Sequence, residues 1–456
     1  MVKVLKLVAL IHLVLLTASS SLKVKTPIPL QNTKPNIVLL FVDDYGWADI
    51  SYRNNLFTTP NLQQLKQESV EFTRAYIPTP TCSPSRYSLL TGREAVRGEM
   101  VRHIKIDKDN PGAKYSLWPS DPAQMPSINY MPLEDVTYAE KLKDLGYYNM
   151  FIGKWHLGHP GRYPEDQGFN ESYGVTNAGN PKNYYYPFFR QDDDPKHYFK
   201  TNKEGDYLTD VLTNRAVDFI ENYNKKQPFM LSFWYYSVHE PSIGKKELVA
   251  KYKAQGLDEK MANHMAMVET MDASVGRIRQ ALLKKNISDN TMFIFISDQG
   301  GAYGNKPLSG GKKGGNTLGE GGARVPFLVY YPQLIKAAKS IDVPVQSIDI
   351  FPTLMELASG THYLDSNIQG VSLLPVLKGK ELAKRNLYFF RSYEDQYSAV
   401  ISGDWKLIKY HSGKFQLFNI SKDISEQNNL IGTNLSIEQI LKTDLAQWEA
   451  EAVPVY

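Results

Sequence analysis

Four apolar stretches of the 456-residue chain each end in polar side chains that could bind a cation or transfer a proton. Asp43 and Asp44 follow the first stretch, and Asp298 and Gln299 follow the last. Their carboxylate and amide oxygens suit a hard cation such as Ca²⁺ or Mg²⁺. Adjacent aspartates repel each other, and a divalent ion would relieve that repulsion. Either pair alone is more typical of a solvated turn, but the two pairs together predict a metal site.

The two middle stretches lead to residues that could move protons or neutralise an anion. Lys154 and His156 lie two residues apart, so an extended backbone would direct both side chains to the same side. His239 follows the third stretch, directly before Glu240 and Pro241. Histidine exchanges protons near neutral pH, and lysine neutralises anionic oxygens. Each of these residues alone is more often structural, but their shared position at strand ends favours a site.

The only cysteine, Cys82, stands in the stretch TCSPSRYSLLTGR. Pro84 suits the first turn of a helix, so Cys82 is expected at a helix N-terminus, where free N–H groups and the helix dipole favour an anion. Arg86 adds a fixed positive charge one turn further on. A buried apolar thiol is the ordinary interpretation. The surroundings also favour a thiolate nucleophile or a modified, oxygen-bearing form of the residue.

A glycine-rich stretch over 300–322 carries Lys306, Lys312 and Lys313. It does not have the spacing of a P-loop, because no serine or threonine follows Lys312. Two interpretations fit it equally. It is a flexible surface loop, or it carries a lysine over the edge of a sheet to meet an anion.

The apolar stretches are expected to be buried strands of an α/β fold. Continuous apolar strands indicate a sheet that is covered on both faces. Helical patterns alternate with these strands, over 133–145, 207–224 and 261–285. This alternation predicts a large, mostly parallel sheet sandwiched by helices. Ligands in such folds bind beyond the carboxyl ends of the strands, which is where the candidate residues stand.

The pattern changes after residue 360. Short alternating strands with turns at Gly403 and Gly413, and a helical stretch over 437–451, predict a small α+β unit with an antiparallel sheet. We therefore expect a catalytic domain over 33–365 and a C-terminal subdomain over 366–456. The chain is long enough for both.

Residues 1–21 have the order of a cleavable signal peptide, with two lysines, a short apolar run and then small residues. No later stretch has membrane-spanning length, so an exported protein, periplasmic or secreted and without a membrane anchor, is expected. The formal net charge of +4 gives no support for nucleic-acid binding. A single cysteine excludes an internal disulfide framework and a multi-cysteine metal site.

Taken together, these stretches resemble the type I sulfatases of the alkaline-phosphatase-like superfamily. CSPSRYSLLTGR is similar to the Cys-x-Pro-Ser-Arg…Thr-Gly-Arg signature of that family, in which the cysteine is oxidised to Cα-formylglycine. PNIVLLFVDDYGWADI, GKWHLGH, FISDQGG and EGGARVPFLVYYP look like further family landmarks in family order. The resemblance covers residues 35–430, and a bacterial polysaccharide sulfatase is the interpretation that fits best.

The resemblance implies a role for each candidate residue. The divalent cation, Ca²⁺ or alternatively Mg²⁺, would be bound by Asp43, Asp44, modified Cys82, Asp298 and Gln299. Arg86 and Lys154 would hold the formylglycine and neutralise charge. His239 and Lys312 would assist cleavage of the sulfate ester, and His156 would assist the release of sulfate.

Two positions depart from the family pattern. The family usually has asparagine where this chain has Gln299, which keeps the carbonyl oxygen on a longer side chain. Lys312 and Lys313 compete for the loop position, because the stretch from Lys312 to Glu320 is longer than usual.

The resemblance also implies two partners, a sulfated glycan substrate and a formylglycine-generating or sulfatase-maturating enzyme. The aromatic-rich stretch over 180–199 would suit stacking on sugar rings, and a surface insertion packed on the core fits it equally. Two alternatives remain. One is a phosphate or phosphonate ester hydrolase of the same superfamily, and the other is a non-catalytic protein that binds sulfated glycans.

Overall fold

A computed structural model describes residues 34–105, 125–193, 196–313, 315–391 and 395–454. The chain divides into two units, residues 1–33 and 34–456, and the description that follows concerns the second. The predicted signal peptide over 1–21 lies outside the described residues. No helix of the described part is long and apolar enough to cross a membrane.

The second unit is built on an eight-stranded sheet with the order β10-β2-β9-β7-β1-β6-β4-β5. Its strands are β1 (Asn36–Val42), β2 (Val70–Phe72), β4 (Tyr148–Gly153), β5 (Glu171–Tyr173), β6 (Phe229–Trp234), β7 (Thr291–Ser297), β9 (Phe327–Tyr330) and β10 (Lys339–Ile341). The five strands from β7 to β5 run parallel to one another. Only β9 is antiparallel to its neighbours β7 and β2. The prediction of a mixed, mostly parallel sheet is confirmed.

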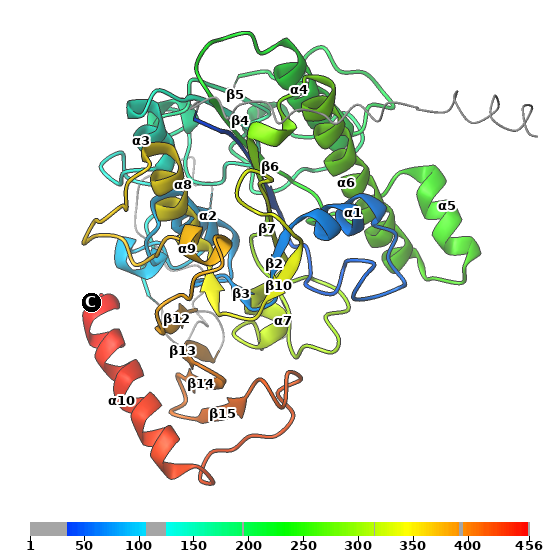
Figure 1. Ribbon diagram of the computed structural model, residues 1–456. Coiled ribbons are helices and arrows are strands. Elements are labelled where there is room, and N and C mark those ends of the chain that lie inside the picture. The colour runs from blue at the N-terminus through cyan, green and yellow to red at the C-terminus, as the bar shows by residue number, and fades with distance from the viewer. Residues whose placement is uncertain (1–33, 106–124, 194–195, 314, 392–394, 455–456) are drawn as a thin grey trace, which may run out of the picture. The chain divides into compact units, whose positions relative to one another are not determined.

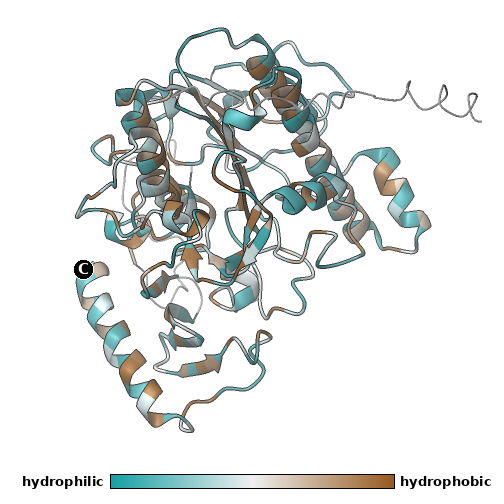
Figure 2. Ribbon diagram, in the orientation of Figure 1, coloured by the Kyte–Doolittle hydropathy of each residue, from teal (hydrophilic) through white to brown (hydrophobic). Residues whose placement is uncertain are grey.

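Helices cover both faces of this sheet (Figure 1). One face carries α1 (Pro60–Glu68), α4 (Leu208–Asn222) and α6 (Glu259–Lys284), with α5 (Lys246–Ala254) against α6. The other carries α2 (Cys82–Thr91), α3 (Tyr138–Asp144), α8 (Ile350–Ser359) and α9 (Leu374–Leu377). Figure 2 shows the central strands hydrophobic along their length, whereas the outer helices mix hydrophobic and hydrophilic residues.

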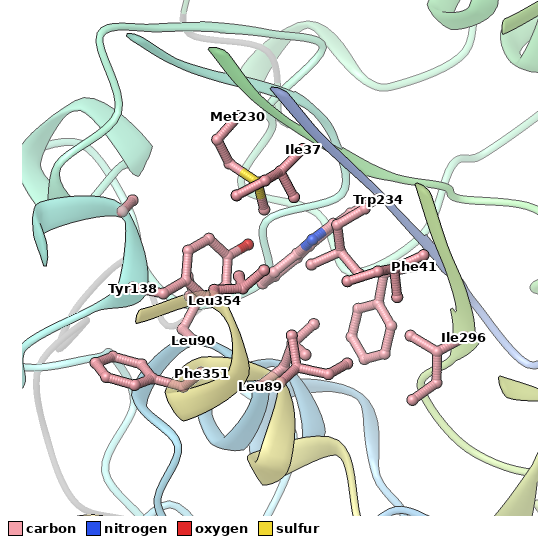
Figure 3. Close-up of a cluster of buried hydrophobic side chains, with 14 of the residues drawn as sticks. Ile37, Phe41, Leu89, Leu90, Tyr138, Met230, Trp234, Ile296, Phe351 and Leu354 are labelled. Atoms are coloured by element: carbon pink, nitrogen blue, oxygen red, sulfur yellow. The ribbon is translucent and has the colours of Figure 1, made fainter. Parts of the chain in front are cut away.

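Strand β1 explains why the sheet needs two helical layers. Val38, Leu40 and Val42 pack into the cluster on the α4 and α6 side, and the intervening residues pack on the α2 and α8 side. Every one of these side chains is fully buried, as expected for a strand covered on both faces. Figure 3 shows the second cluster, in which Leu89 and Leu90 of α2 lie below Phe41 and Trp234 of the sheet. This packing fixes helix α2 against the ends of the central strands.

The predicted helices are confirmed with shifted ends. The helix predicted over 133–145 begins only at residue 138, because Thr137 caps α3. The Thr137 hydroxyl accepts a hydrogen bond from Glu140 N at 3.1 Å, and the Glu140 carboxylate accepts one from Thr137 N at 2.8 Å. This reciprocal capping box ends the extended backbone before residue 138.

The C-terminal part forms a separate antiparallel sheet, as predicted. Its strands are β12 (Asn386–Phe390), β13 (Gln396–Ser402), β14 (Trp405–Tyr410) and β15 (Phe415–Asn419). Helix α10 (Leu435–Ala452) covers one face of this sheet, where the rings of Trp448 and Tyr388 stack with their centroids 5.1 Å apart. The other face packs on Tyr76, Leu318 and Ala323.

The remaining elements are short. They are the three-stranded sheet of β3 (Ala75–Tyr76), β8 (Arg324–Val325) and β11 (Val345–Gln346), helix α7 (Glu320–Ala323), and the 3-10 turns η1 (Ala95–Gly98), η2 (Pro164–Gln167), η3 (Gln191–Asp193), η4 (Ser288–Asn290) and η5 (Ser347–Asp349).

Candidate active site

The carboxyl ends of the central parallel strands meet at one edge of the sheet. Past the ends of β1 and β6, Asp43 N donates a hydrogen bond to Ser237 O at 3.0 Å. Asp298 N, just after β7, donates to Val42 O at 2.9 Å, and Lys154 N, just after β4, donates to Trp234 O at 2.8 Å. The four predicted strand ends therefore lie side by side, and their polar residues share one site.

Cys82 is the first residue of helix α2, as predicted, and its side chain points into this site. The residue is 7% exposed. Its Sγ lies 4.0 Å from Asp43 Oδ1 and 3.5 Å from Gln299 Nε2. This sulfur marks the position that the oxygens of formylglycine would occupy if Cys82 were converted. Burial alone would raise the pKa of the thiol, but Lys154 and Lys312 hold it well below its usual range.

Two fully buried, positively charged side chains bind the carboxylates at the ends of β1 and β7. Lys154 Nζ donates to Asp43 Oδ2. Arg86 Nη2 donates to Asp298 Oδ2 at 2.9 Å and lies 3.6 Å from Asp43 Oδ2. Arg86 Nη1 also donates to Lys154 O at 2.8 Å, which orients the guanidinium. These contacts make Arg86 and Lys154 fixed positive charges in the floor of the site.

The glycine-rich loop places Lys312, not Lys313, in the site. Lys312 Nζ donates to Asp44 Oδ2. Lys313 instead pairs with Glu240 Oε2 at 2.7 Å on the rim. His239 completes this side, with its Nε2 3.8 Å from Asp44 Oδ2. Lys312 and His239 thus join Cys82 and the carboxylates in one site.

The donor set fits a hard divalent cation. One ligand atom from each of Asp43, Asp44, Cys82 and His239 lies within 4.8 Å of the others. Burial and the nearby Asp43 raise the pKa of Asp298 well above its usual range. A divalent cation bound beside this carboxyl group would stabilise its charged form.

Gln299 reaches the same cluster. Its amide nitrogen donates a hydrogen bond to Asp44 Oδ1 at 2.7 Å. The oxygen and nitrogen of an amide are exchanged by a half-turn of the terminal group, which would direct the carbonyl oxygen to this position. The terminal amide of Gln299 therefore reaches the carboxylate of Asp44 despite its longer side chain.

The two histidines of the site have opposite pKa shifts. Burial lowers the pKa of His156, and the Cys82 side chain only partly opposes this. Burial also favours neutral His239, but Asp44 and Asp43 together outweigh it and raise the pKa of His239. His156 Nε2 lies 3.0 Å from Ile104 O, which orients its ring. Groups with pKa values shifted apart suit the roles of base and acid.

Sequence reasoning missed His103. Its ring lies 6.4 Å from the ring of His156, centroid to centroid. Burial, together with the charge of His156, lowers the pKa of His103 from 6.5 to about 4. His103 stands on an irregular segment without hydrophobic periodicity, so no pattern in the sequence marked it.

We expect the stability of the protein to depend on pH through His103. The unfolded chain takes up a proton at this residue below pH 6.5, whereas the folded protein does so only near pH 4. The free energy of unfolding should therefore fall as the pH drops through this window, and at pH 5 it should be roughly 2 kcal/mol lower than at pH 7. His103→Gln should reduce this loss, measured as denaturant unfolding at pH 7 and pH 5. His362→Gln, on the exposed side chain of another histidine, is the control and should leave it unchanged.

A pocket of about 600 Å³ opens beside His239. It is lined by Asn180, Pro181, Lys182, His239, Glu240, Pro241, Ser242, Lys260 and Tyr303. Tyr303 OH donates to Glu240 Oε1 at 3.0 Å, and it lies 3.0 Å from Ser242 Oγ. Apart from His239, sequence reasoning identified none of these as site residues, because they come from three loops and from helix α6, which only the fold brings together.

The expectation that the 180–199 stretch stacks on sugars is wrong for its phenylalanines. Phe188, Phe189 and Phe199 are at most 9% exposed and pack against one another in the core. Of the described residues of this stretch, Asn180, Pro181 and Lys182 line the pocket.

The fold and the site together define a hydrolase of the alkaline-phosphatase-like superfamily. A model of the sulfatase family matches residues 35–361, and one described as N-sulphoglucosamine sulphohydrolase, C-terminal, matches residues 317–451. The chain therefore belongs to the sulfatase family and is a sulfuric ester hydrolase, as predicted.

Known relatives agree with this assignment. N-acetylgalactosamine-6-sulfatase of Canis lupus familiaris is 31% identical over 390 residues, which cover 82% of this chain and 71% of the relative. A sulfatase of Formosa agariphila is 30% identical over 488 residues, covering 89% of this chain and 86% of the relative. The crystal structure of Ps i-CgsB in complex with k-i-k-neocarrahexaose is 28% identical, with a TM-score of 0.78, and covers 92% of this chain and 94% of that chain.

Proposed function

We propose that this sulfatase cleaves sulfate esters of carbohydrates with Cys82, converted to Cα-formylglycine, as its nucleophile and with a divalent cation bound beside it. The observation that carries this is the position of Cys82. It starts a buried helix, its Sγ is 4.0 Å from Asp43 Oδ1, and two lysines lower its pKa. The matching relatives that are sulfatases support the same reaction.

The cation would be held by Asp43, Asp44, Asp298, Gln299 and the modified Cys82. When present, it would supply Lewis-acid stabilisation of the sulfate oxygens, and hydrated formylglycine would supply the two hydroxyls that cysteine lacks. Arg86 holds Asp298 and Lys154 holds Asp43, so that both carboxylates keep their positions beside the nucleophile. Ca²⁺ is our proposed ion, because the set is rich in carboxylate oxygens.

Two lysines and two histidines assist the reaction. Lys154 and Lys312 are placed to neutralise the charge of the sulfate as its bond to the sugar breaks. His239, whose pKa is raised, donates a proton to the departing sugar oxygen from its Nε2. His156, whose pKa is lowered, takes a proton from the nucleophile so that sulfate is released.

The pocket beside His239 supports a glycan with more than one anionic group. Lys182 and Lys260 line it, and neither has a carboxylate partner among the residues that the structure describes. The one carboxylate of the lining, Glu240, is already paired with Lys313. We propose that the sulfated sugar occupies this pocket and that Lys182 and Lys260, whose ammonium lies over the Tyr303 ring, contact a second sulfate or carboxylate.

Sulfate release from defined sugars tests the function. The names of the relatives indicate the first substrates, N-acetylgalactosamine 6-sulfate and carrageenan oligosaccharides, with an aryl phosphate as the comparison. Matured protein should release sulfate from at least one sugar and turn over the phosphate far more slowly. Faster release of phosphate would favour a phosphoesterase, and tight binding without release would favour a glycan-binding protein.

The pocket lysines should affect binding more than turnover. Lys182→Ala and Lys260→Ala should each raise KM for a multiply sulfated oligosaccharide about fivefold, with kcat within twofold. KM for a monosulfated monosaccharide should change little. Lys253→Ala, on an exposed lysine paired with Glu259 outside the pocket, is the control. Equal effects on both substrates would exclude contact with a second anionic group.

The remaining assignments are part of the same proposal. Residues 33–365 form the catalytic domain and 366–456 the C-terminal subdomain. Residues 1–21 direct export to the periplasm or the exterior. A formylglycine-generating or sulfatase-maturating enzyme acts on Cys82.

A further inference from the structure

A buried cluster of charges lies between the glycine-rich loop and the C-terminal sheet. Lys406 of β14 pairs with Glu320 Oε1 at 2.8 Å and with Glu426 Oε1 at 3.0 Å. All three side chains are at most 2% exposed. A buried ion cluster is weak evidence for stability, because desolvation of its charges offsets their attraction. The groups that it contacts indicate a different role.

Glu426 connects this cluster to the loop that carries Lys312. Its Oε2 accepts hydrogen bonds from the Ser309 hydroxyl and from Glu320 N, the second at 2.8 Å. The backbone of Glu426 has a φ of 50°, in the left-handed region that residues other than glycine rarely adopt. The turn after β15 thus holds an unusual conformation where its carboxylate meets the loop.

Gln396 of β13 holds the same loop on the far side of Lys312. Its Oε1 accepts a hydrogen bond from Leu318 N at 2.7 Å, and its Nε2 donates to Asn316 Oδ1 at 2.8 Å. Asn316 Nδ2 in turn donates to Ser309 Oγ at 3.2 Å. The C-terminal sheet therefore anchors the chain both before and after Lys312.

The loop needs such anchors because its own backbone is permissive. Glycines at 300, 301, 304, 310, 311, 315 and 319 leave few side chains to restrict it. Lys312 N donates to Gly301 O at 3.1 Å, and its side chain reaches Asp44. Without the contacts at Ser309, the loop could shift while the rest of the fold stayed intact.

The same sheet also holds the turn ahead of Cys82. Arg391, next to β12, donates from Nη1 to Pro80 O at 2.9 Å and to Thr81 Oγ1 at 2.8 Å. Phe390 N donates to Pro78 O at 3.0 Å. One C-terminal sheet thus contacts the segments that carry two groups of the proposed mechanism.

We infer that Glu426, held by Lys406, is a positioning residue that fixes Lys312 in the active site. The C-terminal sheet is then part of the catalytic apparatus and not only a stabilising cover. This inference rests on the proposed function, in which Lys312 neutralises the sulfate.

Glu426→Gln tests the inference, and Glu449→Gln is its matched control. Glu449 likewise accepts a hydrogen bond from a serine, Ser398, and pairs with a lysine, Lys409, but it belongs to α10 and does not touch the loop. Glu426→Gln should lower kcat about tenfold with KM within twofold, and Glu449→Gln should leave both unchanged. The melting temperatures of the two variants should match.

A double-mutant cycle and amide hydrogen exchange separate positioning from general damage. In a Lys312→Ala background, Glu426→Gln should lower kcat no further, because its effect passes through Lys312. Exchange in peptides over 300–313 should be faster in Glu426→Gln than in wild type or Glu449→Gln. The inference would be overturned if the loop of Glu426→Gln exchanged its amide hydrogens at the wild-type rate. It would also be overturned if Glu426→Gln lowered kcat equally in the wild-type and Lys312→Ala backgrounds. An inactive wild type would contradict the proposed function, and the exchange rates would still decide whether Glu426 holds the loop.

Discussion

Cys82→Ala is expected to lower sulfate release by at least about 10⁴-fold while leaving the fold intact. Alanine removes the group that becomes the nucleophile, and no other described side chain at the strand ends offers an equivalent aldehyde precursor. The effect on stability should be small, because a methyl group fits where the buried thiol packs. Release of sulfate from the substrates named above, with circular dichroism of both proteins, provides the measurement.

Cys82→Ser is the matched control, because unoxidised serine has one hydroxyl and lacks the second hydroxyl of hydrated formylglycine. It should accept sulfate from substrate and then fail to release it, so that the sulfate stays on the peptide over 75–86. Mass spectrometry of that peptide from wild type should show the aldehyde or its hydrate at residue 82. Unmodified cysteine in fully active wild type would contradict the proposed nucleophile.

The second large effect is expected from removal of the divalent cation. Chelation should abolish activity, and Ca²⁺ should restore it better than Mg²⁺. Saturating Ca²⁺ at a hundredfold excess over Kd stabilises the folded state by about 2.7 kcal/mol. For a chain of this size, that raises Tm by about 3 °C. The measurement is a thermal scan of the chelated protein with each ion added back.

Asp298→Asn identifies the site of that ion. The substitution keeps the size of the side chain but removes a charge shared with Arg86 and the proposed cation. Activity should fall about 10³-fold, and the Ca²⁺-dependent shift in Tm should disappear. Asp404→Asn, on a carboxylate that pairs with Arg74 at the surface, is the control. A full Ca²⁺ shift in Asp298→Asn would place the ion elsewhere.

Much of this architecture could be predicted from the sequence, because the relevant signals are local. The apolar runs before Asp43 and Asp298 have strand length, and parallel strands separated by helices must end at the same edge. Pro84 predicted the start of the helix that presents Cys82. These patterns depend on residues close together in the chain, and the structure confirms the elements that they predicted.

Other features of the site could not be predicted from local sequence patterns. Lys312 and Lys313 are equivalent in sequence, and only the path of the loop directs one to Asp44 and the other to Glu240. His103 has no periodic neighbours, so its position beside His156 depends on how an irregular segment packs. No spacing rule predicts such contacts.

The sequence by itself determined the class of fold and the kinds of polar side chain that converge at the strand ends. Hydrophobic periodicity and residue chemistry are sufficient for this, since both are short-range properties of the chain. Cys82 became the candidate nucleophile precursor through the resemblance of its segment to the sulfatase signature. Only the tertiary structure decided which lysine reaches the site, which loops line the pocket and that Glu426 holds the Lys312 loop. Those outcomes depend on packing between segments far apart in sequence. A buried charge is costly without a partner of opposite charge, and no local pattern specifies which residue that partner is.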